Sequence, residues 1–345
     1  MQLLTNSRMQ AFKTCRRKHF YAYEMGLRRE TDARALRIGS AVHEALDRWK
    51  RVQPMEVVMG AVDDFYAEPP DAVDEDEWWI EHQTTAGLVS GYDWRWQGHA
   101  FDVIASEQSF DLPLENPATG AVTSSFRLAG KIDGVVQVDG RLLVLEHKTV
   151  SESIEQDSDY WRLLQLDPQI SLYVWAARRL GHDVSGVLYD VIRKPTIQPT
   201  RVPLTDADDM PIVLDAAGKR VYTAAGKPRK TGDAAKGYTL QTRPMTPSEW
   251  QKKLLADIGQ RPTYYYARQE IARLDDDVAE HMVEVWELQK TIRDAQRHDR
   301  WYKTAGRNTC PYCPYFGLCT SRYQPNGETP EGFVKLEDVH PELEL

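Results

Sequence analysis

Residues 126–150, FRLAGKIDGVVQVDGRLLVLEHKTV, constrain the fold more than any other stretch of the chain. Two runs rich in valine and leucine flank Asp139-Gly140, and an Asp-Gly pair between apolar runs is a strong signal for a two-residue β-hairpin turn. Val138 then lies opposite Arg141, and this pair fixes the register of both strands. The sequence therefore predicts a sheet built around this hairpin.

The same register brings two carboxylates and an amine together. Counting back from the turn places Asp133 opposite Glu146, and directly opposed residues share a face with Cβ atoms about 5 Å apart. Lys148 points to that face because side chains alternate along a strand. Two opposed carboxylates destabilise a sheet unless a cation offsets them, so we expect Mg²⁺ or Mn²⁺ here, with Lys148 orienting a water or balancing phosphate charge. The alternative is a solvent-facing strand pair in which Lys148 alone balances the acids.

Two predicted helices offer further polar groups. His43, in GSAVHEAL, lies off the apolar stripe of a helix over residues 37–51, so it is either a surface residue or a third metal ligand. Gln169 and Tyr173 share one face of a helix over about 168–180. This pair either contacts DNA, supports the lysine of the hairpin, or packs in the ordinary way.

The four cysteines come from two distant parts of the chain. CPYCPYFGLC, residues 310–319, holds three of them, and the fourth is Cys15. No apolar run is long enough to span a membrane, and MQLLTNSRMQ lacks the apolar core of a signal peptide, so we expect a cytosolic (cytoplasmic) protein. In that compartment, four thiols favour metal or redox chemistry over structural disulfides.

Charge is distributed unevenly along the 345 residues. The formal net charge is −9, which does not by itself indicate nucleic-acid binding. Residues 8–37, however, carry nine Lys or Arg against three Asp or Glu, a local balance of +6. This stretch is either a phosphate-binding patch or a solvated helix face.

The order of elements predicts an α/β core wrapped by helices. Residues 195–245, rich in Pro, Gly, Thr and Asp, indicate a flexible insertion with one hairpin at 211–223, and we find no internal repeat. Asp167 is the expected cap of the helix that follows it. Helices are predicted over 6–25 (capped by Asn6 or Ser7), 37–51, 55–66, 76–98, 168–180, 246–259 and 275–296, and strands over 101–150 and 185–193.

Taken together, GSAVHEAL, GKID, LEHK and QISLY, in this order, resemble the RecB-like branch of the PD-(D/E)XK nuclease superfamily. The resemblance implies an α/β restriction-endonuclease-like core, with a mixed central sheet flanked by helices, in a single nuclease domain over 1–345. It also implies a weaker supporting role for Glu107. The residues that it assigns are the metal ligands His43, Asp133, Glu146 and the backbone carbonyl of His147, the catalytic lysine Lys148, and a Gln-x-x-x-Tyr element at Gln169 and Tyr173.

The cysteines are similar to those of a subset of this branch that carries an iron–sulfur cluster, including the AddB nuclease domain and the nuclease of CRISPR adaptation. That resemblance implies a helical region in which residues 1–30 and 297–322 close a clasp around the cluster, followed by a tail over 323–345. Zinc on the same thiolates is the rival interpretation. The implied ligands of the [4Fe–4S] cluster are Cys15, Cys310, Cys313 and Cys319.

The resulting hypothesis is a metal-dependent DNA exonuclease that acts on single strands or DNA ends in recombination, repair or phage replication. Phe20, Tyr21 and Tyr23 are expected to stack on DNA beside the basic stretch. No G-x-x-x-x-G-K-[ST] sequence occurs, so we expect no fused helicase. The alternative is a DNA-binding subunit of a CRISPR-adaptation or recombination complex, which an exposed apolar patch on the tryptophan-rich helix 76–98 would favour. An electron-transfer iron–sulfur protein leaves the hairpin acids unexplained.

Overall fold

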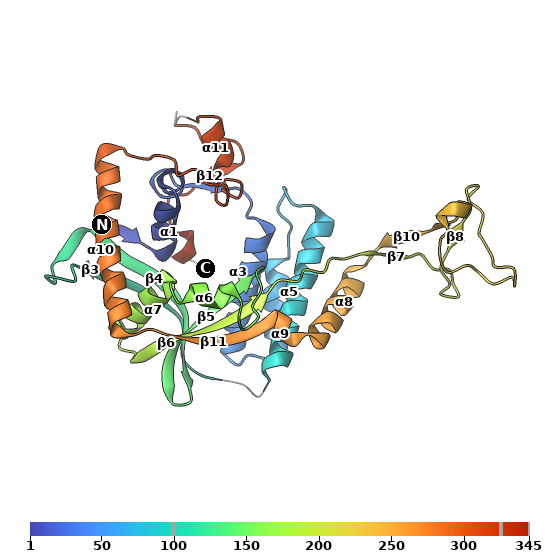
Figure 1. The fold of residues 1–345 in the computed structure, drawn as a ribbon, viewed down its shortest axis with the longest axis horizontal. Helices are drawn as coiled ribbons and strands as arrows, with labels where there is room; N and C mark the ends of the chain where they lie inside the picture. The colour runs from blue at the N-terminus through green and yellow to red at the C-terminus, as the bar shows by residue number, and fades with distance from the viewer. Residues whose placement is uncertain (98–100, 324–326, 344–345) are drawn as a thin grey trace.

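A mixed sheet forms the centre of the protein in a computed structural model that describes residues 1–97, 101–323 and 327–343 (Figure 1). Its strand order is β1-β4-β5-β6-β11, and β3 pairs with β4. The pairs β1/β4 and β5/β6 are parallel, and the other neighbours are antiparallel. The strands are β1 (Gln2–Leu4), β3 (Asp102–Glu115), β4 (Val122–Val138), β5 (Arg141–Val150), β6 (Val184–Arg193) and β11 (Tyr266–Ala272).

The predicted hairpin joins β4 to β5. Asp139 and Gly140 both have positive φ, 48° and 79°, as a type I′ turn requires. The ladder runs from the pair at the turn as far as Gly134 and Leu145 and then stops. Beyond that point β4 pairs with β1 at residues 126–128, so the two hairpin strands separate over residues 129–133. This separation opens the sheet at the position of the predicted acids.

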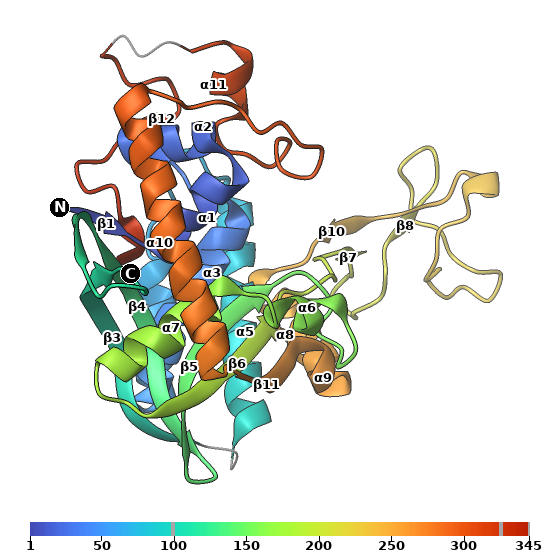
Figure 2. The same cartoon turned by 60° about the vertical axis from the view of Figure 1, so that its left-hand side comes forward.

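Helices cover both faces of the sheet (Figures 1 and 2). One apolar core places Val135, Val144 and Tyr189 against the helices α1, α7 and α10. A second core, under α3, α4, α5 and α8, includes Val42 and Leu254. This arrangement agrees with the predicted α/β class. The helices are α1 (Asn6–Thr14), α3 (Arg34–Lys50), α4 (Met55–Phe65), α5 (Glu75–Trp96), α6 (Asp159–Leu164), α7 (Pro168–Arg179), α8 (Pro247–Gln260), α9 (Pro262–Tyr265) and α10 (Asp275–His298).

The first predicted helix is interrupted, so the prediction of one helix over 6–25 is wrong. Cys15 is extended, at φ −165° and ψ 119°, and ends α1; α2 (Arg16–His19) and the π-helical turn η1 (Phe20–Glu24) follow it. The cap is Thr5, whose Oγ1 accepts a bond of 3.1 Å from the Arg8 amide, rather than Asn6 or Ser7. The extended residue turns the Cys15 thiol toward the C-terminal part of the chain.

The N- and C-terminal regions pack on each other. Strand β12 (Phe333–Lys335) pairs with β2 (Leu27–Arg29), and the hydroxyl of Tyr315 donates to the Leu27 carbonyl at 2.7 Å. Tyr21, Leu27 and Phe333 belong to an apolar cluster of their own. The short helices of this region are α11 (Phe316–Thr320) and the 3₁₀ turn η3 (Pro341–Leu343). Residues 324–326 and 344–345 of the predicted tail lie outside the described residues.

The predicted insertion projects from the body as a narrow arm (Figure 1). Its stem is the antiparallel pair of β7 (Arg201–Pro203) and β10 (Thr242–Pro244), and farther out β8 (Val213–Leu214) pairs with β9 (Thr239–Leu240). The 3₁₀ turn η2 (Ala234–Lys236) lies between β8 and β9 in the chain. A hairpin is present within 211–223, closed by a bridge between Leu214 and Arg220. Flexibility of the arm stays a prediction.

The tryptophans of α5 do not form one exposed patch. Trp78 is buried and Trp96 packs against the second core, whereas Trp79 and Trp94 are exposed. Residue 98 of the predicted helix lies outside the described residues. Among the described residues, no helix has both the length and the apolar character needed to cross a bilayer.

Candidate active site

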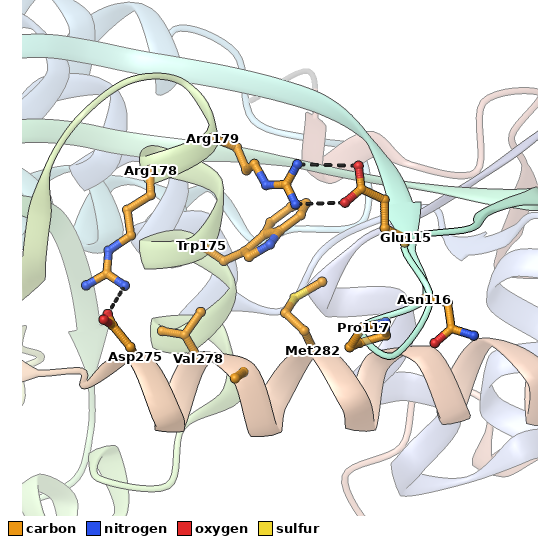
Figure 3. A pocket seen from close by; sticks show the side chains of 11 residues that line it. Glu115, Asn116, Pro117, Trp175, Arg178, Arg179, Asp275, Val278 and Met282 are labelled. Carbon is orange, nitrogen blue, oxygen red and sulfur yellow. Dashed lines mark hydrogen bonds and ion pairs between the residues drawn. The ribbon is translucent and has the colours of Figure 1, made fainter.

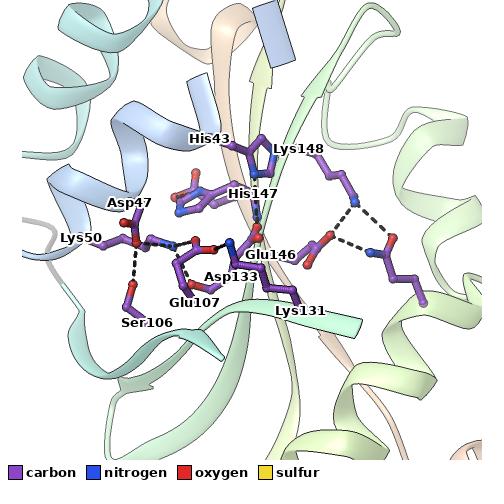
Figure 4. A network of polar contacts seen from close by, with 12 residues as sticks. His43, Asp47, Lys50, Ser106, Glu107, Lys131, Asp133, Glu146, His147 and Lys148 are labelled. Carbon is purple, nitrogen blue, oxygen red and sulfur yellow. Dashed lines mark hydrogen bonds and ion pairs between the residues drawn. The ribbon is translucent and has the colours of Figure 1, made fainter. Parts of the chain in front are cut away.

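Strand β5 carries the central residues of the candidate site beyond the point where the ladder with β4 ends (Figure 4). Because side chains alternate, Glu146 and Lys148 face α7, and His147 faces the opposite side of the sheet. The strand continues here as a parallel neighbour of β6, with Glu146 beside Tyr189 and His147 beside Asp190. The site is therefore held on a central strand that is paired on one edge only.

Glu146, Lys148 and Gln169 form a closed set of polar contacts. Lys148 Nζ lies 2.5 Å from Glu146 Oε1 and donates to Gln169 Oε1 at 3.1 Å, while Gln169 Nε2 donates to Glu146 Oε1 at 3.1 Å. Glu146 is 3% exposed, and its second oxygen, Oε2, is buried without a hydrogen-bond partner. A buried carboxylate oxygen with no partner is costly unless a cation or a donor satisfies it.

Burial governs the ionisation of this pair. It raises the pKa of Glu146 to about 8; Lys148 opposes the shift and Asp133 adds to it. Burial also disfavours the Lys148 ammonium, but the neighbouring Glu146 outweighs this and raises the pKa of the lysine. A cation at Glu146 would favour the ionised carboxylate, as does the lysine already present.

Asp133 lies where β4 leaves β5. The sequence predicts that Asp133 and Glu146 are directly opposed partners in the ladder. This prediction is wrong, because the ladder stops one pair earlier, at Gly134 and Leu145. Instead, Asp133 Oδ2 accepts a hydrogen bond of 2.8 Å from the His147 amide. This side-chain bond stands where the ladder would have a backbone bond. The two acids still interact, because Asp133 raises the pKa of Glu146. His43 Nδ1, on α3, lies 3.7 Å from the same Asp133 oxygen.

Sequence reasoning missed the lysines on the other side of Asp133. Lys50 has a side chain that is 1% exposed, and its Nζ donates to the Asp133 backbone carbonyl and, at 3.0 Å, to Glu107 Oε1. Lys131 pairs with Glu107 Oε2 at 2.7 Å. Glu107 has a positive φ of 50°, an uncommon conformation for this residue type. The available signal was that Lys50 follows His43 by seven residues and therefore shares its helix face.

The imidazole of His147 belongs to a different, buried environment. It is 2% exposed, its two ring nitrogens lack hydrogen-bond partners, and Nδ1 lies 3.7 Å from Asp190 Oδ2. Asp190 in turn accepts bonds from the Tyr92 hydroxyl and from Arg268 Nε. Burial lowers the pKa of His147 well below its usual range, so the ring is neutral. The predicted role of its backbone carbonyl stays a prediction.

Helix α7 positions Gln169 and Tyr173. Asp167 caps the helix as predicted, since its Oδ1 accepts the Gln169 amide at 2.8 Å. Tyr173 packs edge-on against Phe110 at a centroid distance of 6.3 Å, and burial raises its pKa well above the usual range. The phenol is therefore a neutral hydrogen-bonding group on the predicted face.

The donor set of the site suits a hard divalent cation, although it is not assembled as a complete shell. Carboxylate oxygens with one imidazole are ligands that Mg²⁺ and Mn²⁺ accept, and Glu146 Oε2 has an unused acceptor position. Within the described residues, no three His, Cys, Asp or Glu side chains are close enough together to hold one ion. Glu146 Oε2 can accept an ion without loss of the Lys148 contact, because Lys148 lies on the other oxygen, Oε1.

The four cysteines line one cavity of about 350 Å³ between α1, α2 and the C-terminal segment. All four are free thiols. The Thr304 amide points at Cys15 Sγ (3.3 Å) and the Gly306 amide at Cys310 Sγ (3.4 Å). A single Zn²⁺ with bonds of about 2.3 Å needs four sulfurs roughly 4 Å apart, and the described residues contain no such group. The choice between zinc and an iron–sulfur cluster at these four thiols stays a prediction.

The expected stacking on DNA is wrong for two of the three aromatic residues in the basic N-terminal stretch; Phe20 is only partly buried, and phosphate binding by the stretch stays a prediction. Tyr21 and Tyr23 are buried, 2% and 9% exposed, and cannot stack on a ligand. Arg8 is 2% exposed and pairs with Glu24 at 3.1 Å. Arg37 pairs with the buried Glu81.

A separate cavity of about 560 Å³ lies between α7, α10 and the tip of the β3–β4 hairpin (Figure 3). Trp175 and Met282 form its apolar lining. Arg179 pairs with Glu115 at 2.8 Å, and Arg178 pairs with Asp275 at 2.9 Å. These pairs neutralise the charges of the cavity, which is distinct from the site on β5.

Three comparisons place the chain among known proteins. The sequence profile of the PD-(D/E)XK nuclease superfamily matches residues 4–320. No curated protein matches the chain. Among solved structures, the one described as "Crystal structure of SSO0001" is similar at 12% identity and a TM-score of 0.28, over 83% of this chain and 85% of that chain. That TM-score is too low for the likeness to carry an argument.

Proposed function

Because the chain belongs to the PD-(D/E)XK nuclease superfamily, we propose that it is a metal-dependent DNA exonuclease acting on single strands or DNA ends, in recombination, repair or phage replication. One observation carries the proposal. The buried Glu146 forms a polar triangle with the half-buried Lys148 and Gln169 beside Asp133, and it keeps one oxygen, Oε2, without a partner. Such an arrangement is expensive to maintain for stability alone and is typical of a site prepared for a charged ligand.

The proposed metal ligands are Asp133, Glu146, the backbone carbonyl of His147, and His43. A bound Mg²⁺ or Mn²⁺ supplies positive charge for the phosphate and makes a bound water more acidic. Lys148, which contacts Glu146 at 2.5 Å, would donate a hydrogen bond to a phosphate oxygen and stabilise the negative charge that develops there. Gln169 keeps the lysine directed at the site, because its amide bonds both Lys148 and Glu146.

The cysteine cavity supports a [4Fe–4S] cluster as the second proposed group, bound by Cys15, Cys310, Cys313 and Cys319. Its role would be structural, because it would strengthen the contact between α2 and the C-terminal segment, where the Arg17 amide already donates to the Tyr302 carbonyl at 3.2 Å. The backbone amides that point at two of the sulfurs are the kind of contact that tunes such clusters.

The test is cleavage of end-labelled single- and double-stranded DNA with Mg²⁺, Mn²⁺ or EDTA. Glu146→Gln and Lys148→Ala are each expected to lower the cleavage rate by about 10²–10⁴-fold. Gln169→Ala is expected to lower it less, because it only directs the lysine. The matched control is Lys252→Ala, an exposed lysine on α8, with an unchanged rate.

Two results would count against this function. Metal-independent cleavage, or an active Lys148→Ala enzyme, would contradict the assigned mechanism. DNA binding without cleavage under any metal would favour the alternative of a DNA-binding subunit of a larger complex. Products released from one end only distinguish an exonuclease from an endonuclease.

A further inference from the structure

The arm is built from one turn used three times. In each turn an Asp or Thr amide donates to the carbonyl four residues later, and a residue with positive φ precedes that acceptor. The same Asp or Thr side chain also accepts the amide of the later residue, at 2.9 Å from Asp206 and Asp215 and 3.2 Å from Thr223. The turns are Asp206–Met210, Asp215–Lys219 and Thr223–Lys227.

The turns are also chained to one another by backbone bonds. Ile212 donates to Leu204, Val221 donates to Val213, and Arg229 donates to Val221, at 2.8, 2.9 and 3.2 Å. The sequence phrases DADDMP, DAAGKR and TAAGKP recur at intervals of nine and eight residues, which is an internal repeat that sequence reasoning missed. The repeat gives the arm a regular backbone although Val213 is the one buried apolar side chain among its described residues.

Charge is segregated along this repeat. Residues 205–215 carry four aspartates and no Lys or Arg. Residues 216–238 carry six Lys or Arg and a single acid, Asp233, a local balance of +5 in a chain of net charge −9. Three of these six have ion-pair partners, the acids Asp206 and Asp233. Lys219, Lys227 and Lys230 are exposed and form no ion pair with any described residue.

We propose that the outer part of the arm, residues 216–238, binds the phosphate backbone of DNA outside the active site. This inference rests on the proposed nuclease function for the identity of its ligand. Lys219 and Lys227 are the last residues of two of the turns, and such exposed lysines present ammonium groups at intervals along a narrow element, which suits a polyanion. Tyr222, 53% exposed beside Arg220, adds a ring that can stack on a base.

The arm's surface argues against a protein partner. Interfaces between proteins need aromatic and aliphatic anchors in their centre, whereas the large exposed hydrophobic residues within the described arm are Leu204 and Tyr222. The stem of β7 and β10 also holds the arm away from the body (Figure 1), so its contacts with DNA add to those of the active site. Binding through both elements raises the apparent affinity without a new catalytic contact.

The experiment compares DNA binding by two variants of equal net charge. The arm variant is K219E/K227E/K230E/K236E, and the control carries four reversals at exposed body residues, R48E/K252E/K290E/K335E. Fluorescence anisotropy with labelled single- and double-stranded DNA, over a series of salt concentrations, gives both the affinity and its salt slope. The arm variant is expected to bind ~10–100-fold more weakly with a smaller salt slope, and the control is expected to bind like the parent.

A second variant guards against a folding artefact: residues 205–241 are replaced by a two-residue Gly-containing turn that joins β7 to β10. It should keep the thermal midpoint of the body and lose DNA affinity to a similar extent. Equal weakening of DNA binding in the arm variant and the control would overturn the proposal. Unchanged DNA binding in the arm variant would also overturn it, and would favour an acidic protein as the ligand of the arm. If the parent protein binds DNA through the arm but cleaves it under no condition, the proposed DNA-binding role of the arm stands and the nuclease proposal is refuted.

Discussion

Lys50 shows how a buried charge can support a site from behind. Its ammonium is almost fully enclosed and bonds both Glu107 and the Asp133 carbonyl, so it fixes the backbone from which the Asp133 carboxylate projects. A buried charge is tolerated when its hydrogen bonds are satisfied, and its loss leaves the partner uncompensated.

Lys50→Met is therefore expected to destabilise the protein by about 3–5 kcal/mol and to weaken cleavage, because Glu107 would retain Lys131 alone. Urea unfolding monitored by tryptophan fluorescence measures the change. The matched control is Arg48→Met, an exposed residue of the same helix, with an effect within about 0.5 kcal/mol. Equal midpoints for the two variants would contradict the role given to Lys50.

His19 makes stability depend on pH. Burial, with contributions from Arg8 and His340, lowers the pKa of its imidazole to about 3, and Nε2 accepts a bond from Arg8 Nε at 3.2 Å. The unfolded chain binds a proton near the ordinary pKa of about 6.5, whereas the folded chain does not. The stability contributed by the neutral ring is thus complete above that value and falls as pH drops toward 3.

His19→Gln, which keeps an acceptor for Arg8, is expected to flatten the loss of unfolding free energy between pH 6.5 and pH 4 by an amount on the order of a few kcal/mol. Denaturant titrations at several pH values provide the measurement. His298→Gln, at an exposed histidine, serves as the control and should follow the parent. A variant profile as steep as the parent's would show that His19 is not the group responsible.

At the scale of elements, the contact of α5 with α8 and β11 depends on two glycines. A Cβ added at Gly91 would collide with the Tyr266 hydroxyl and lie 2.9 Å from Ile258 Cγ2, and one at Gly87 would lie 2.9 Å from a Leu254 methyl. These approaches let α8 pack directly on α5. The cost of glycine in a helix is thereby offset by burial of Trp250, Leu254 and Ile258.

Gly91→Ala is expected to cost about 1–3 kcal/mol through overpacking and to lower the thermal midpoint by several degrees. Gly60→Ala, on α4, is the matched control, since an added Cβ there meets nothing within 4 Å. That control should be neutral or stabilising by about 0.4–1 kcal/mol. Differential scanning calorimetry compares them; the idea of close packing is wrong if Gly91→Ala is tolerated as well as Gly60→Ala.

Elements defined by local signals could be predicted from the sequence. The Asp139-Gly140 turn, the cap Asp167 and the helix at Met55–Phe65 each follow from neighbouring residues. The break at Cys15 could not be predicted, because it depends on contacts with residues about 290 positions away, such as the Thr304 amide. The Lys50–Glu107 network depends likewise on α3 meeting β3.

At the scale of the molecule, the four cysteines bring residues from distant parts of the chain to one cavity. The cavity is lined from α2 and from residues 303–320, and β2 pairs with β12 nearby. Cys313→Ser is expected to abolish bound iron and the brown colour of an anaerobic preparation and to cost several kcal/mol, by analogy with a crosslink over a long loop.

Iron and sulfide analysis, visible absorption and thermal unfolding measure this effect. Thr309→Ala, at another residue lining the cavity, is the control that should keep iron and stability. A colourless, fully active parent protein that contains zinc would refute the iron–sulfur cluster. The two ends of the chain would then be held together by the apolar contacts of Tyr21, Leu27 and Phe333 and by the pairing of β2 with β12.

The arm has a consequence for how the polypeptide tolerates cutting. A single protease nick in an exposed turn such as Thr223–Lys227 would divide the backbone into two pieces that remain joined by α5 against α8, by β6 beside β11 and by β2 beside β12. The nicked species should migrate as one particle in size-exclusion chromatography and as two bands on a denaturing gel. The same position offers a place to divide the gene into two separately expressed halves that reassemble.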